Sequence, residues 1–261
     1  MSRDNKAFGK KPADIARGRV TVRHPFQKVA ILVDGDFFLR RLKTISEPQR
    51  EFDVNTALAA LRKMMHEHID YTGRELYRLF FYDCKPLDEK RHLPISKRCL
   101  DYSTTPQCIF RKQLHNELKK QRKCALRLGY ILDSKDNRWI MKGSVLHDLL
   151  NKKRRFEELT DGDFTANIRQ KQVDMMIGVD IATLCLKELV DTIVLVSGDG
   201  DFVPASKLAR REGIDFILDP MHMESQIHEA LFEHIDAIHN ALQNRSNRKT
   251  SFRNTESMQK T

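Results

Sequence analysis

Short apolar runs that end on acidic turns recur along this chain of 261 residues. Lys28 to Asp34 is apolar over its middle five residues, and Thr192 to Val196 contains only β-branched residues and leucine. Short continuous runs of this kind, bounded by glycine, are typical of strands buried on both faces. Residues 75 to 82 form a third predicted strand, which ends on Asp83. These runs predict the central strands of a sheet.

Apolar residues at helical spacing separate these strands. The predicted helices cover residues 54 to 70, 110 to 123, 171 to 189, 203 to 212 and 224 to 242. Asp53 is the expected N-cap of the first helix, and Gly213 is the expected C-cap of the fourth. Further strands are predicted at residues 125 to 132, 138 to 141 and 214 to 218, with the first two paired across a turn at 134 to 137.

Strands that alternate with helices at this spacing are typical of a parallel sheet with right-handed crossovers. We therefore predict one doubly wound α/β domain over residues 27 to 243, with a basic insertion at residues 85 to 160. Residues 1 to 26 and 244 to 261 are polar and basic and lack a convincing period. We expect them to form a flexible arm and a disordered tail.

Two of the predicted strands are each followed by a pair of aspartates. Asp34 and Asp36 follow the first strand, and Asp199 and Asp201 follow the strand at residues 192 to 196. Parallel sheets bind ligands at the carboxyl ends of their strands, so these four acids would meet if the two strands are neighbours. Like charges at such a place repel strongly and need a cation or a proton among them. The pattern favours a divalent-metal site.

Each of these residues also has a structural interpretation. An aspartate at a strand-to-helix turn often caps the helix, although two such turns together favour metal binding. Asp174 and Asp180 lie among apolar residues of one predicted helix, about 120° apart around its axis, so they are not expected to bind one ion equivalently. Lys171 could neutralise Asp174 or hold a phosphate, and Ser197 could hydrogen-bond a carboxylate or close its turn.

Positive charge is concentrated in one part of the chain. The formal net charge is +10, and residues 85 to 155 contain 19 Lys and Arg against 7 Asp and Glu. A basic surface beside an acidic metal pocket suits a polyanionic substrate, although a solvated basic face is the alternative. The candidate nucleic-acid-binding residues are Lys97, Arg98, Arg111, Lys112, Lys152, Lys153, Arg154 and Arg155.

Several other classes of protein are disfavoured. The five cysteines form no C-x-x-C pair, which argues against a zinc knuckle and a disulfide framework. The histidines do not stack on one helical face, and neither Walker nor G-x-G-x-x-G spacing occurs. No window approaches the length of an apolar membrane span, and the N-terminus lacks a signal peptide's apolar core. We expect a cytoplasmic protein with reduced thiols and no membrane association.

Three motifs resemble the NYN domain family, the LabA-like members of the PIN-like nuclease superfamily. They are Val33-Asp34-Gly35-Asp36, Lys171-Gln-Val-Asp174 with Asp180 six residues on, and Ser197-Gly-Asp199-Gly-Asp201-Phe202 followed by a stretch to Gly213. The resemblance covers about residues 28 to 240. It departs at Asp36, where the family usually has Asn.

The resemblance implies a PIN-like three-layer α/β/α sandwich around a parallel sheet. It also implies Mg²⁺ or Mn²⁺ held by Asp34, Asp174, Asp199 and Asp201, with Asp180 matching a helical acid of wider PIN-like proteins and Asp83 as a further contributor. The implied activity is endonucleolytic cleavage, usually of RNA, single-stranded or structured. This agrees with the phosphodiester cleavage suggested by the acids and the basic insertion. The oligomeric state stays open, a homo-oligomer included.

Two other functions are compatible with the sequence. Asp34-Gly-Asp36 also resembles the nucleophile and acid pair of HAD-type phosphatases, in which Asp34 would be a covalent nucleophile. Phe38 argues against this, because that pattern has Thr or Val at its position. The other alternative is a catalytically silent RNA-binding or regulatory module in which the acids are structural.

Overall fold

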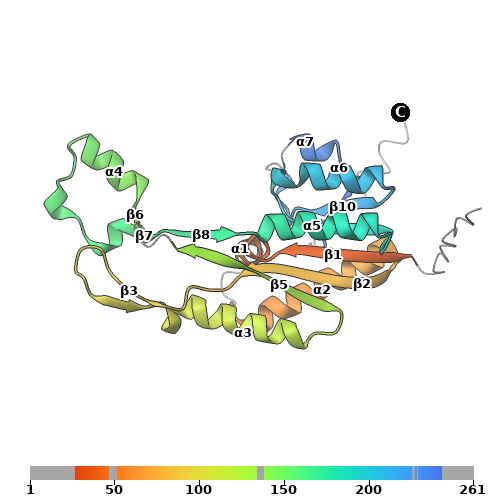
Figure 1. Ribbon diagram of the computed structural model, residues 1–261, viewed down its shortest axis with the longest axis horizontal. Helices are drawn as coiled ribbons and strands as arrows, with labels where there is room; N and C mark the ends of the chain where they lie inside the picture. The colour runs from red at the N-terminus through yellow and green to blue at the C-terminus, as the bar shows by residue number, and fades with distance from the viewer. Residues whose placement is uncertain (1–26, 47–51, 134–137, 225–226, 228, 243–261) are drawn as a thin grey trace, which may run out of the picture.

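A seven-stranded sheet forms the centre of the computed structural model, which describes residues 27–46, 52–133, 138–224, 227 and 229–242 (Figure 1). The strand order is β11-β10-β9-β1-β2-β5-β8. Six strands run parallel, and β8 pairs antiparallel with β5 at one edge. The strands are β1 (Lys28–Asp34), β2 (Glu75–Cys84), β5 (Cys124–Asp133), β8 (Ile168–Lys171), β9 (Thr192–Val196), β10 (Asp215–Asp219) and β11 (Ala237–Ile238).

Helices cover both faces of this sheet, which confirms the predicted α/β/α sandwich. One face packs against α1 (Gly35–Ile45), α2 (Val54–Thr72) and α3 (Pro106–Lys120). The other face packs against α5 (Val173–Leu186), α6 (Val203–Arg211) and α7 (Glu229–Phe232). The described residues include no helix that is both long and apolar enough to cross a membrane.

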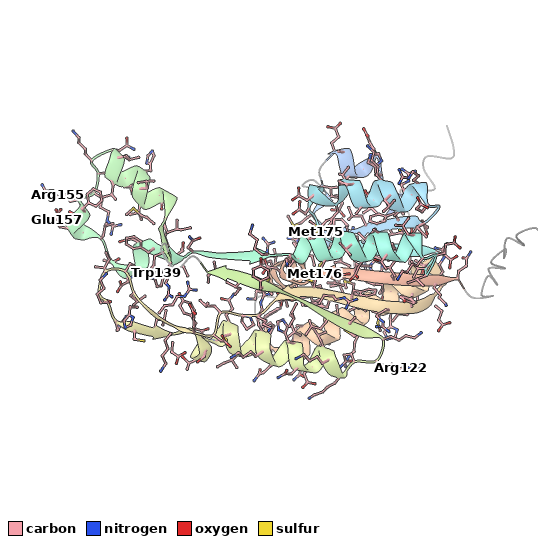
Figure 2. All side chains as sticks on the ribbon, in the orientation of Figure 1. Arg122, Trp139, Arg155, Glu157, Met175 and Met176 are labelled. Atoms are coloured by element: carbon pink, nitrogen blue, oxygen red, sulfur yellow. The ribbon has the colours of Figure 1, made fainter. Side chains whose placement is uncertain are left out.

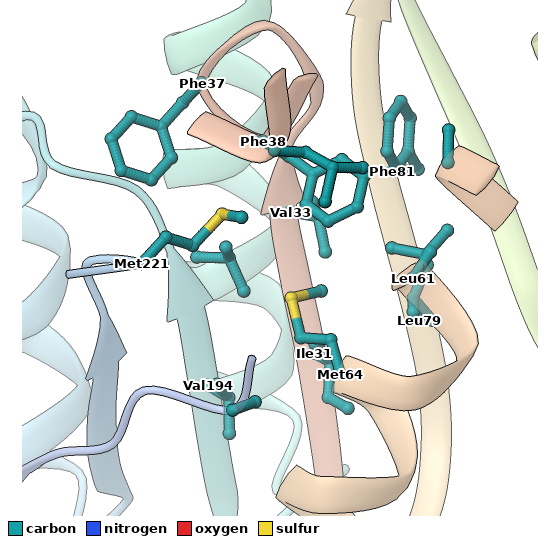
Figure 3. Packing of buried hydrophobic residues seen from close by; sticks show 14 of the residues in the cluster. Ile31, Val33, Phe37, Phe38, Leu61, Met64, Leu79, Phe81, Val194 and Met221 are labelled. Atoms are coloured by element: carbon teal, nitrogen blue, oxygen red, sulfur yellow. The ribbon is translucent and has the colours of Figure 1, made fainter. Parts of the chain in front are cut away.

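The alternation of side chains along β1 divides the core into two clusters. Ile31 and Val33 point to the α1–α2 face, where Phe38, Met64 and Phe81 surround them (Figure 3). Residues 30 and 32 point to the α5–α6 face. All five residues from 29 to 33 are 0% exposed, because β1 is paired on both edges and covered on both faces. Burying each of the four larger side chains, those of the valine, isoleucine and leucine residues, contributes about 1.5 to 3 kcal/mol.

Several helix boundaries follow from capping residues. Asp53 accepts a hydrogen bond from the Thr56 amide, which confirms it as the cap of α2. Thr105 caps α3 in the same way, and Pro106 follows it, so α3 begins four residues earlier than predicted. Gly213 lies just past the end of α6 with φ of +80°, as the prediction required.

Segments between β2 and α5 project beyond the carboxyl edge of the sheet (Figure 1). We call residues 86–104 and 138–166 the extension. It contains the hairpins β3 (Lys90–His92) with β4 (Cys99–Asp101) and β6 (Trp139–Met141) with β7 (Phe164–Ala166), together with α4 (Gly143–Leu150). The Trp139 indole N–H donates to the His92 carbonyl at 3.0 Å, and the Asp161 carboxylate accepts the amides of residues 95 and 96. These bonds join the two hairpins.

One predicted strand pairing and one predicted helix are wrong. Residues 138 to 141 do not pair with β5, because β6 pairs with β7 and the edge of β5 is taken by β8. The single helix predicted over residues 224 to 242 is replaced by the short α7 and the strand β11, which pairs with β10. Ala237 packs on one core cluster and Ile238 on the other, as consecutive strand residues do. The predicted arm and tail lie outside the described residues.

Gly35 should tolerate no side chain. A Cβ there would lie 2.5 Å from the Phe81 ring and 2.6 Å from the Tyr82 carbonyl oxygen, so α1 would have to move away from β2. We expect Gly35→Ala to lower the free energy of unfolding by about 2 to 4 kcal/mol. Gly178→Ala, in the middle of α5 with nothing within 4 Å, should instead raise it by about 0.5 to 1 kcal/mol. Urea unfolding of both variants measures these changes, and equal effects would contradict the packing of Gly35.

Candidate functional site

The pairing of β1 with β9 places two acidic turns side by side at the carboxyl edge of the sheet. Val33 is in register with Val196, so Asp34 and Ser197 leave adjacent strands at the same level. The Asp34 carboxylate accepts the amides of Asp36 and Phe37 at 3.1 Å and thereby caps α1. Asp34 therefore has a fixed orientation at the start of that helix.

The turn after β9 is ordered by its own side chains. The buried Ser197 hydroxyl accepts the Asp199 amide at 3.2 Å, and the Asp199 carboxylate accepts the Asp201 amide at 3.0 Å. Of the two uses predicted for Ser197, the structure shows the closing of the turn. Asp199 and Asp201 are both exposed to solvent. They are thus presented at the surface by a short hydrogen-bonded loop.

Asp174, exposed in the first turn of α5, completes an acidic group with Asp34, Asp199 and Asp201. Burial, together with the charges of Asp36 and Asp174, raises the pKa of Asp34 to about 6, against the lowering effects of the Phe37 amide and the Arg40 charge. Burial also raises the pKa of Asp174, as do the charges of Asp199 and Asp201.

No lysine, arginine or histidine in the described part of the chain forms an ion pair with any of these four carboxylates. Within the described residues their mutual repulsion is therefore offset only in part, through the more distant charge of Arg40 acting on Asp34. We call the four residues Asp34, Asp174, Asp199 and Asp201 the acidic group.

Asp36 and Asp83, by contrast, form ion pairs with Arg111, a residue of α3. Arg111 donates to the Asp36 carboxylate at 2.6 Å and also to Asp83, which is 1% exposed. The His115 ring bonds the second oxygen of Asp83 at 2.7 Å. Arg111 was predicted to bind nucleic acid at the surface, but its side chain is only 11% exposed and holds α1, β2 and α3 together. The i, i+4 spacing of Arg111 and His115 on one helix was the available sequence signal.

Asp180 lies farther along α5, about 9 Å from Asp174 in axial rise. Its carboxylate accepts hydrogen bonds from the Tyr82 hydroxyl at 2.8 Å and from Arg127 at 3.1 Å. The structure therefore engages Asp180 with β2 and β5 and does not bring it into the acidic group. Lys171, at the end of β8, is exposed.

The acidic group has the oxygen ligands that Mg²⁺ and Mn²⁺ prefer. Within the described residues, however, no three Asp, Glu, His or Cys side chains converge closely enough to enclose an ion. Magnesium keeps several of its waters and commonly uses only one or two protein carboxylates, so a group of separated carboxylates fits such an ion. The chemistry of the donors and their uncompensated charge thus suit a hydrated divalent cation.

Most of the predicted nucleic-acid-binding residues lie on the extension. Lys97, Arg98, Lys152, Lys153 and Arg155 are exposed there, and Arg155 is labelled near its outer end in Figure 2.

The remaining basic residues of that set are engaged in contacts within the protein. Arg154 instead pairs with both oxygens of Asp163, at 2.8 and 2.6 Å, and bonds the Glu158 carbonyl. Lys112, on α3, pairs with Asp88 at 3.1 Å. Arg154 therefore stabilises the extension internally.

The model of the NYN domain family matches residues 100–236, which is more than half of the chain. The chain belongs to the NYN domain family. This is a PIN-like nuclease domain family, and the match includes Asp174, Asp199 and Asp201. Asp34 precedes the matched residues and reaches the site through β1 of the NYN protein. Searches of curated proteins and of solved structures gave no match.

The buried charge of Asp34 should destabilise the metal-free NYN protein. Below pH 3.8 the carboxyl is protonated in the folded and unfolded chains alike. As the pH rises from 3.8 to about 6 the unfolded chain loses its proton first, so the stability falls. Asp34→Asn keeps the capping oxygen and should raise the stability by about 1 to 2 kcal/mol at pH 7.5 in EDTA, with little effect at pH 4. Thermal unfolding at both pH values measures this; a lower melting temperature at pH 7.5 would contradict it.

The charge of Asp163 should stabilise the folded protein, in contrast to the charge of Asp34. Hydrogen bonds from Arg154 and the Thr160 amide hold its pKa at about 2, so its ionised form stabilises the folded chain. That contribution is present above pH 3.8 and is lost as the pH falls toward 2. We expect Asp163→Asn to lower the melting temperature at pH 7 and to speed amide hydrogen exchange in the extension. Unchanged exchange would show that the Arg154 pair does not hold the extension.

Proposed function

We propose that this NYN protein is a metal-dependent endoribonuclease that hydrolyses phosphodiester bonds of RNA. The observation that carries the proposal is the acidic group, in which four carboxylates share one edge of the sheet with no cationic partner among the described residues. Membership of a PIN-like nuclease family supports the same chemistry. The five cysteines are free, which suits the reducing cytoplasm where we place the activity.

A bound Mg²⁺ or Mn²⁺ would lower the pKa of an attacking water and offset charge on the phosphate. Asp34 and Asp199, whose orientations are set by backbone amides, would hold the ion, and Asp174 and Asp201 would bind its waters. The exposed basic side chains of the extension, such as those of Lys152 and Arg155, would bind phosphates of the RNA strand beyond the acidic group. Their contribution should weaken as salt is added.

One observation favours a second function, an RNA-binding module without catalysis. No three potential ligands enclose a metal position in the described part of the chain, and Asp36 and Asp83 serve an internal ion-pair network. Such a module would bind RNA equally with and without divalent ions and would give no product. Hydrolysis of a small phosphoester with a trapped aspartyl-phosphate would instead indicate a HAD-type phosphatase.

Asp199→Asn should abolish cleavage while leaving RNA binding nearly unchanged. The amide keeps the hydrogen-bond acceptor that orders the turn but removes the charge that would hold the cation. We expect a loss of at least about 100-fold in the rate of cleavage of end-labelled RNA in Mn²⁺. Wild-type protein should also gain thermal stability with Mn²⁺, and the variant should gain less.

Asp180→Asn is the matched control on the neighbouring helix. Because Asp180 contacts Tyr82 and Arg127, its substitution should reduce cleavage much less than Asp199→Asn does. An equal loss of cleavage in both variants would indicate that Asp180 belongs to the metal site after all. Wild-type rates in Asp199→Asn would reject the acidic group as the catalytic centre, and intact RNA with wild-type protein in every metal would favour the binding module.

A further inference from the structure

A cleft opens beside the acidic group, between the sheet edge and the extension. Its volume is about 140 Å³, smaller than a site for a drug-sized molecule, and it is open to solvent. One wall carries Asp36 and Arg111, so the cleft adjoins the strand end at which Asp34 lies. Its floor is apolar and includes Leu87, Ile131 and Ile168. A charged phosphate has little to bind on such a floor, whereas a flat uncharged ring fits it.

Tyr102 gives the cleft an aromatic wall. The Arg91 guanidinium lies 5.9 Å from the centre of the Tyr102 ring, and Arg91 is fully buried and does not line the cleft. Tyr102 itself is among the residues that line the cleft. Asp101 fixes the turn that carries this ring by accepting the Ser103 amide and hydroxyl at 2.9 and 2.5 Å. A ring held in place in this way can stack on a base at a low cost in ordering.

Two polar side chains at the cleft are available to a ligand. Gln107, in the first turn of α3, is exposed and forms no side-chain hydrogen bond within the described residues. Its amide can donate and accept, as the edge of a base requires. Lys85 is exposed and forms no ion pair in the part of the chain that the structure describes. Its ammonium can hold the phosphate of the same nucleotide.

We propose that this cleft is a nucleobase subsite, which takes one base of a single-stranded RNA next to the acidic group. Tyr102 stacks on the base, Gln107 bonds its edge, and Lys85 binds its phosphate. A base inside a duplex cannot enter, because its faces are already stacked and its edge is paired. The subsite therefore selects single strands and fixes one nucleotide beside the place of cleavage. The choice of RNA rests on the function proposed above, whereas the shape and chemistry of the cleft do not.

Abasic scanning of a short labelled RNA tests the subsite without any cleavage. Fluorescence anisotropy in EDTA measures the affinity of single-stranded oligonucleotides in which one nucleotide at a time lacks its base. We expect a loss of about tenfold at one position of the strand, the size expected for a stacked base, and smaller losses elsewhere. Affinities that do not depend on any single base would overturn the proposal, whatever the total affinity.

Gln107→Trp places a bulky ring at the cleft, and Asn116→Trp places the same ring on an exposed position of α3 outside it. The first variant should lose the position-specific abasic effect, and the second should keep it. Tyr102→Phe should keep the effect and Tyr102→Leu should lose it. Gln107→Ala removes only the amide and replaces the tryptophan variant if that one does not fold. An abasic profile of Gln107→Trp identical to that of Asn116→Trp, with both folded, would overturn the subsite.

The outcomes separate this inference from the proposed function. If wild-type protein shows the abasic effect but never cuts RNA, the nuclease proposal fails and the subsite stands as part of a binding module. If RNA is cut in Mn²⁺ and no base dependence is found, the nuclease proposal stands and the subsite fails.

Discussion

The burial of β1 between β2 and β9 is the constraint on which the rest of this structure depends. Five consecutive residues of β1 are inaccessible to solvent, so the strand can neither slide nor tilt without disturbing both core clusters. Its end fixes Asp34, and the same register fixes the turn that carries Asp199 on the neighbouring strand. Gly35 lets α1 begin directly against β2. The apolar core thereby sets the position of charged groups that are themselves only partly buried.

The carboxylates at this edge fall into two electrostatic classes. Asp36 and Asp83 form ion pairs with Arg111, and Asp83 also hydrogen-bonds His115, which makes both acids part of the framework. The acidic group forms no such ion pair among the described residues; burial raises the pKa of Asp34 and of Asp174, and the charges of neighbouring aspartates raise both further. A fold that leaves like charges together in this way is less stable for it, which is common where a ligand supplies the missing charge. The same edge thus contains a structural ion-pair network and a site suited to a cation.

The extension adds a second kind of surface to the NYN core. Internal ion pairs, such as Arg154 with Asp163, use some of its charge to hold its hairpins, while Lys152, Arg155 and their neighbours remain exposed. The cleft exists only where this surface meets the sheet, because its walls come from both. In Figure 1 the hairpin β6–β7 and helix α4 of the extension lie beyond the carboxyl end of β1, the strand end that carries Asp34. This arrangement suits a strand that passes from the extension across the edge of the sheet.

Much of the fold was determined by the sequence, because local rules apply where burial is complete. The apolar runs ending at Asp34 and Val196 could only be inner strands, and Asp53 and Gly213 mark helix ends through interactions within a few residues. The predictions of secondary structure and strand pairing failed at the edges of the sheet. Segments there are only partly covered, so the period of their hydrophobic residues does not decide between helix and strand. The last segment shows this, since its apolar residues have helical spacing and yet divide between both faces around β11.

The candidate site was only partly determined by the sequence. The acids of the acidic group are each identifiable from the strand or helix that carries them, and the register of β1 with β9 brings two of their turns together. Which charges are neutralised was decided by tertiary structure alone. Arg111 and Asp83 are 28 residues apart, and Asp180 meets Tyr82 across 98 residues, so no local pattern could show those contacts. The physical reason is that an ion pair depends on a distance of a few ångströms in space, and that distance is set by the packing of whole elements.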